Sequence, residues 1–128
     1  MTRHWRDIDL GEALLHRRAV LPERWDIRLE RDWPVPVRPS RRRYAHQIRQ
    51  DLWRAARTVR GFVPMIAVGW TDGVVHVSAG GTLNAGPAPQ LSDILAGVLD
   101  DPRNRRRWDR YAQARSKKKG QGTCSTRS

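Results

Sequence analysis

One short segment alternates apolar and charged residues with a period of two. Trp25, Ile27 and Leu29 are separated by charged residues, which is the pattern of a half-buried strand. Residues 33–39 follow with three prolines, and proline lacks the N–H donor that a sheet needs. We therefore expect a strand over about 25–30 and an extended connector after it.

A second alternating segment runs from Met65 to Gly80. Its centre is Asp72-Gly73, a pair suited to the positive backbone dihedrals of a two-residue type I′ turn. With these two residues as the loop, every cross-strand pair on one face is apolar, which fixes the register. The expected pairs are Trp70 with Val75, Val68 with Val77, and Ile66 with Ala79, and Thr71 lies opposite Val74. The segment thus predicts a β-hairpin over about 65–80.

The longest helical pattern begins after Ser40, a residue favoured at helix N-caps. Neither glycine nor proline occurs again until Gly61, so a helix is predicted from Arg41 to about Arg60. At 100° per residue, one continuous side of this helix is apolar and should face the core. That stripe consists of Tyr44, Ile48, Leu52, Ala55 and Val59.

A shorter helix is predicted near the start of the chain. Asp9 and Glu12 have the spacing of a capping box, and the apolar residues that follow indicate a helix to about Arg18. In this interpretation Asp7 and Asp9 lie at a helix start, where carboxylates stabilise the helix dipole.

Two more helices are predicted towards the C-terminus. Apolar residues between Leu91 and Leu99 recur at helical spacing. Asp101 and Pro102 then form a cap and first residue for a helix over Arg103 to about 115. Residues 116–128 contain no apolar anchor, so we expect a disordered basic tail.

Together these elements predict a single α+β domain over residues 1–115. A small antiparallel sheet contains the hairpin, the strand at 25–30 lies beside it, and the long helix and the C-terminal helices pack on it. We expect Trp25 and Trp70 in the core because they share the apolar faces of strands. Trp5, Trp33 and Trp108 are instead candidates for anchoring a partner.

Charge is unevenly distributed along the chain. The formal net charge is +12, from 25 basic and 13 acidic residues. Residues 38–60 contain eight arginines and one acid, and residues 103–119 contain nine basic residues and one acid. These two segments carry more than the whole net charge, so the remainder is mildly acidic. Such segregation is typical of a protein that binds a polyanion, although a solvated or protein-binding surface has the same composition.

The side of the 41–60 helix opposite the apolar stripe is basic. Guanidinium groups pair with phosphates, and an exposed tryptophan can stack on a base, so this face is the predicted binding surface, unless Trp53 packs into the core. Its candidate residues are Arg42, Arg43, His46, Arg49, Trp53, Arg54, Arg57 and Arg60. The second basic segment adds Arg105, Arg106, Arg107, Arg110, Lys117, Lys118 and Lys119.

The sequence gives little support for disulfide formation, metal binding or catalysis. The single cysteine, Cys124, cannot form an internal disulfide or a thiolate zinc cluster. The four histidines show no metal-binding motif, and no nucleophile or phosphate-loop motif is present. No cofactor is expected. The chain begins without a signal-peptide pattern, and residues 62–70 are too short to cross a membrane. We therefore expect a cytoplasmic protein without membrane insertion.

These observations favour a small, basic, non-enzymatic protein that binds DNA or RNA. Its phosphate contacts would come from the arginine-rich helix and the basic C-terminal segment. The alternative is a protein interaction module or regulatory subunit that docks on an acidic partner through the same Arg and Trp face. The residues do not favour one nucleic acid over the other.

Overall fold

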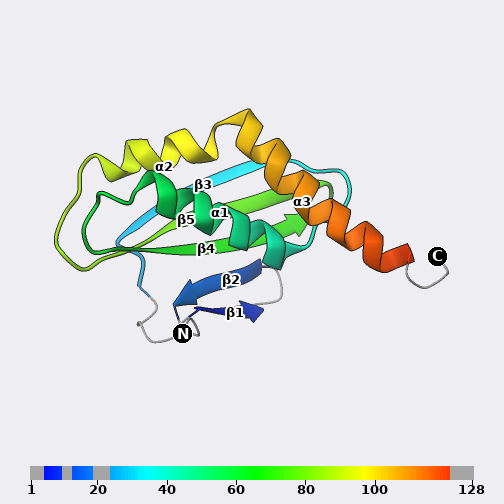
Figure 1. Ribbon diagram of the computed structural model, residues 1–128, viewed down its shortest axis with the longest axis horizontal. Helices are drawn as coiled ribbons and strands as arrows, with labels where there is room; N and C mark the ends of the chain where they lie inside the picture. The colour runs from blue at the N-terminus through cyan, green and yellow to red at the C-terminus, as the bar shows by residue number, and fades with distance from the viewer. Residues whose placement is uncertain (1–4, 10–12, 19–23, 122–128) are drawn as a thin grey trace.

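The computed structural model describes residues 5–9, 13–18 and 24–121, and it confirms an α+β fold. Five strands and three helices follow one another along the chain (Figure 1). Their bounds are β1 Trp5–Asp9, β2 Ala13–Arg18, β3 Ile27–Pro34, α1 Arg41–Ala55, β4 Phe62–Thr71, β5 Val74–Leu83, α2 Leu91–Leu99 and α3 Pro102–Gln121.

The five strands form one antiparallel sheet in the order β1-β2-β4-β5-β3. Its centre is the predicted hairpin of β4 and β5, and the register is the predicted one, from Thr71 opposite Val74 to Ile66 opposite Ala79. Asp72 and Gly73 form the turn, with φ angles of 50° and 80°, as a type I′ turn requires. The predicted neighbouring strand also pairs with this hairpin, since β3 lies along β5.

The helices cover one face of the sheet (Figure 1). Helix α1 packs on β4 and β2, α2 packs on β3, and α3 packs on α1. Tyr44, Ile48 and Leu52 of α1 are fully buried in one core cluster with Ile66 and Val68 of β4, so this part of the predicted apolar stripe faces the core. Ala55 is exposed instead, and Val59 is buried but lies after the end of α1. On the other face, polar side chains pair with one another. Arg28 pairs with Glu30 at 3.2 Å, and His76 pairs with Asp32 at 2.9 Å.

The predicted N-terminal helix is wrong, because this region forms β1 and β2. Leu14 lies opposite Val68 and His16 opposite Ile66 in the β2–β4 ladder. In a strand, Leu14 and His16 face the helices while Leu15 and Arg17 face the other side. Pairing with the central hairpin therefore outweighs the local capping-box spacing, and Asp7 and Asp9 lie in an edge strand rather than at a helix start.

Several helix and strand ends also differ from the predicted ones. The Oγ of Ser40 accepts from the Arg43 N–H, which confirms the cap. However, α1 ends at Ala55, so Arg57 and Arg60 follow it in a turn. The strand predicted at 25–30 covers Ile27–Pro34 instead.

At the C-terminus, α3 begins as predicted, with an Asp101 oxygen accepting from the Arg103 N–H at 2.9 Å. The helix continues to Gln121, so residues 116–121 of the predicted disordered tail are helical. Residues 122–128 lie outside the described residues. The domain boundary at 115 stays a prediction.

Two tryptophans predicted as partner anchors are core residues. Trp33 and Trp108 are buried, and their ring centroids lie 6.1 Å apart beside Tyr44. The Trp33 indole N–H donates to the Tyr44 hydroxyl at 3.1 Å, and burial raises the pKa of Tyr44 to about 12. Trp70 packs against the core, but Trp25 precedes β3 and is only half-buried. The side chain of Trp5 lies outside the described residues.

Candidate nucleic-acid interface

The outer face of α1 carries an exposed tryptophan among arginines. Trp53 is 54% exposed, although tryptophan is usually mostly buried. The guanidinium carbon of Arg57 lies 5.6 Å from its ring centroid, within the range of a cation–π contact. Arg42, Arg54 and Arg57 are exposed as well. The predicted exposure of Trp53 is therefore confirmed, and the interpretation of Trp53 as a core residue is wrong.

Helix α3 places the second basic segment beside the first. The buried carboxylate of Asp51 accepts from the Trp108 indole N–H at 2.7 Å and pairs with Arg107 at 2.9 Å. This contact joins α3 to α1. Arg106, Arg107 and Arg110 are exposed on α3. Both basic segments therefore lie in the helical layer and face away from the sheet. The backbone of Lys117, Lys118 and Lys119 lies in α3, and their side chains are outside the described residues.

Some of the predicted phosphate ligands have structural contacts instead. The guanidinium of Arg105 lies 4.2 Å from the Trp33 ring centroid, and its Nε donates to the Leu99 carbonyl at 2.7 Å. Arg105 also pairs with Asp100 at 3.1 Å. Arg49 is half-buried and donates to histidine nitrogens, as described below. These contacts tie Arg105 to the core and Arg49 to two histidines, so part of each guanidinium is already engaged within the fold.

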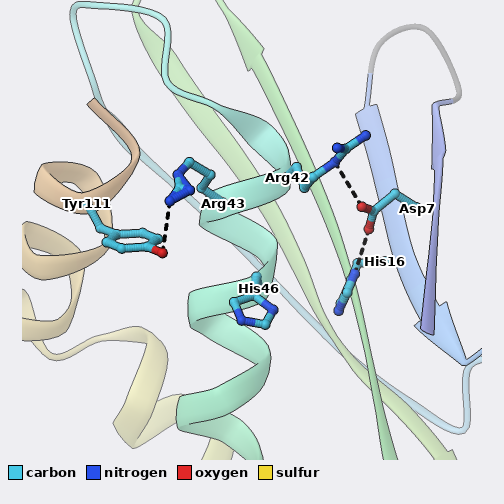
Figure 2. Close-up of a pocket in the computed structure, with 6 residues that line it drawn as sticks. All are labelled: Asp7, His16, Arg42, Arg43, His46 and Tyr111. Carbon is cyan, nitrogen blue, oxygen red and sulfur yellow. Dashed lines mark hydrogen bonds and ion pairs between the residues drawn. The ribbon is translucent and has the colours of Figure 1, made fainter. Parts of the chain in front are cut away.

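A pocket of about 400 Å³ opens over the first turns of α1. It lies between the β1–β2 edge and α3, as Figure 2 shows. The lining residues are Asp7, His16, Arg42, Arg43, His46 and Tyr111. Three of them, Arg42, Arg43 and His46, are among the predicted binding residues. The sequence reasoning missed Asp7, His16 and Tyr111. The alternation of Asp7 with Ile8 and of His16 with Leu15 was the signal that could have placed the first two on one face of a sheet.

Arg49 determines which nitrogen of each histidine carries the proton. Its Nε donates to Nε2 of His16 at 2.9 Å, and its Nη2 lies 3.2 Å from Nδ1 of His46. Because a guanidinium donates and never accepts, both of these ring nitrogens are acceptors. In the neutral rings, the proton therefore lies on Nδ1 of His16 and on Nε2 of His46. The first donates to Oδ1 of Asp7 at 2.6 Å.

Both histidines are neutral near pH 7. Burial lowers the pKa of His16 below its ordinary value of 6.5, although the hydrogen bond to Asp7 partly opposes this. Burial, and then the positive charge of Arg49, lower the pKa of His46. Burial also lowers the pKa of Arg49, and the charge of Asp7 opposes this shift. A neutral imidazole has one donor and one acceptor, so each ring keeps a defined hydrogen-bonding role.

Arg43 connects the pocket to α3. Its Nη2 donates to the Tyr111 hydroxyl at 2.9 Å, and its guanidinium carbon lies 4.3 Å from the centre of that ring. On the other side of the pocket, Nε of Arg42 lies 3.0 Å from Oδ2 of Asp7. Asp7 thus holds both His16 and Arg42, which Figure 2 shows as two dashed contacts to one carboxylate.

Within the described part of the chain, no group of three or more metal-ligating side chains lies close enough together to hold a metal ion. No helix there is long and apolar enough to cross a membrane. Comparison with models of known protein families, with curated proteins and with solved structures gives no match.

Proposed function

We propose that this chain is a small, non-enzymatic, cytoplasmic protein that binds nucleic acid through the outer face of its helical layer. The observation that carries the proposal is the exposed Trp53 beside Arg57. A base stacked on an aromatic side chain contributes about 1–3 kcal/mol. The neighbouring guanidinium groups would bind the phosphates on either side of that base.

The distribution of ion pairs supports this face over the opposite one. Among the described residues, Arg57, Arg60, Arg106 and Arg110 are exposed and make no ion pair with a carboxylate. Their charge is available to a polyanion. On the open face of the sheet, the charge of Arg28 is balanced by Glu30 on the same strand.

The test is a fluorescence titration with single-stranded and duplex DNA and RNA at several salt concentrations. Each phosphate that the protein neutralises should contribute about 0.7–0.9 to the slope of log affinity against log salt. Arg57→Gln and Arg106→Gln should each weaken binding and reduce that slope by about 1. The matched control is Arg28→Gln, on the opposite face, which should change neither quantity.

Absence of binding at low salt to every nucleic acid would overturn the proposal. Purification from the native host with and without nuclease would then test the alternative. An acidic protein that copurifies after nuclease treatment, and is lost with Arg57→Gln, would show that the face binds a protein instead.

A further inference from the structure

The pocket over the first turns of α1 presents hydrogen-bond donors to a ligand. Its carboxylate, Asp7, is occupied at both oxygens by His16 and Arg42. Nδ1 of His46 accepts from Arg49, so the Nε2–H of His46 remains to donate to a ligand. The Tyr111 hydroxyl accepts from Arg43, so its hydrogen is also able to donate.

The arginines add charge to these neutral donors. Arg42 uses Nε for Asp7, and its side chain is 74% exposed, so its two terminal nitrogens can reach a ligand. Arg43 uses Nη2 for Tyr111, which leaves Nη1 for a ligand. Its Nε is buried without a hydrogen-bond partner in the described part of the chain. The pocket therefore combines two guanidinium groups, one imidazole N–H and one phenol.

We propose that this pocket binds the terminal phosphate of a nucleic-acid strand. A terminal phosphate has three non-bridging oxygens and a charge of about −1.5 to −2 at pH 7. An internal phosphodiester has two such oxygens and one charge, so it gives these donors fewer acceptor oxygens and less negative charge. A convergent set of donors from α1 and α3 in a concave site therefore fits a strand end better than a continuous backbone.

The position of the pocket agrees with the proposed interface. His46 and Trp53 lie on the same side of α1, seven residues apart, which corresponds to about 10 Å along the helix. That is about three steps of a stacked strand at 3.4 Å each. One strand end can thus place its phosphate in the pocket and a base near Trp53. This inference rests on the proposed function, because it specifies which part of a nucleic acid the interface recognises.

The experiment compares oligonucleotides of one sequence, in DNA and RNA, that carry a 5′-phosphate, a 3′-phosphate or only hydroxyl ends. At one salt concentration, we expect at least one phosphorylated end to bind about tenfold more tightly than the hydroxyl end. This is the effect of one or two charge-assisted hydrogen bonds. Inorganic phosphate should compete with the phosphorylated strand and leave the binding of the hydroxyl strand unchanged.

Variants assign this preference to the pocket. Tyr111→Phe should reduce the preference towards onefold while the hydroxyl strand binds as before. Gln47→Ala, on the same helix and outside the pocket lining, should retain the tenfold ratio. Trp53→Ala should weaken both strands by the same factor. Thermal unfolding of each variant shows that the folded state is retained.

The possible results separate the two proposals. Equal affinity for phosphorylated and hydroxyl strands overturns the terminal-phosphate inference, and the proposed function stands if Trp53→Ala still weakens both. Competition by inorganic phosphate without any preference for phosphorylated strands also overturns it, since the pocket would then bind a small phosphate. If no strand binds at low salt, the proposed function and this inference both fail.

Discussion

Replacing Trp53 with alanine distinguishes the two faces of α1. A fully buried tryptophan covers about 200 Å², and Trp53 is 54% exposed, so roughly 90 Å² is covered in the folded state. At about 25 cal/mol per Å², this area contributes at most about 2 kcal/mol. Alanine retains part of the contact and favours the helix by about 0.5 kcal/mol. We therefore expect a loss of about 1 kcal/mol in the free energy of unfolding.

Ile48→Ala is the matched substitution on the buried face. Ile48 is 0% exposed and lies in the core cluster, where removal of an isoleucine side chain costs about 2–5 kcal/mol. In a thermal scan, Trp53→Ala should lower Tm by roughly 4 °C, and Ile48→Ala by roughly 12 °C. In a titration with nucleic acid, Trp53→Ala should lose more affinity than Ile48→Ala, because it removes about 1–3 kcal/mol of stacking.

If Trp53→Ala unfolds as readily as Ile48→Ala, Trp53 contributes to the core more than its exposure indicates, which contradicts its assignment to the binding face. If both variants bind nucleic acid as tightly as the natural chain, the binding surface does not include the outer face of α1.

Three further predictions concern the fold. Asp51→Ala removes the acceptor of the buried Trp108 indole and should cost about 2–3 kcal/mol in a urea titration, whereas Asp51→Asn keeps an acceptor and should cost less. His16 and His46 have folded pKa values below 6.5, so the unfolded chain binds more protons as the pH falls through that value. Stability should therefore decrease between pH 7.5 and 5.5, and a His16→Gln, His46→Gln double variant should show a flatter profile. Gly73 has a φ of 80° with open space around it, so Gly73→Val should cost about 1–2 kcal/mol through backbone strain alone, and an unchanged Tm would contradict the type I′ turn.

The features predicted correctly from the sequence depend on neighbouring residues. The register of β4 and β5 follows from Asp72-Gly73 and the alternation on either side. The caps at Ser40 and Asp101 also act within three residues. In each case the sequence separation between the interacting groups is small, so the pattern determines the structure without knowledge of the rest of the fold.

The features that were missed depend on distant pairing. The segment Ala13–Arg18 becomes a strand because it pairs with β4, whose residues lie 50 to 56 positions later in the chain. Its misinterpretation as a helix hid the contact of Asp7 with His16, which needs the β1–β2 register. The burial of Trp108 depends in the same way on Asp51, on another helix. Alternation could have placed Asp7 and His16 on one face of a sheet, but only the β1–β2 register brings these two lining residues together.

The strand order β1-β2-β4-β5-β3 also has a consequence for the time course of synthesis. Strands β2 and β3 emerge before the hairpin over 62–83, and each pairs with a strand of that hairpin. Until then, β1 and β2 are the only described strands that can pair with each other. The pocket forms later still, because two of its lining residues, Asp7 and Tyr111, are roughly 100 residues apart in the sequence. At about 5–20 residues per second, Asp7 leaves the ribosome some 5 to 20 s before Tyr111, and a ligand that contacts both residues can be captured only after Tyr111 has emerged.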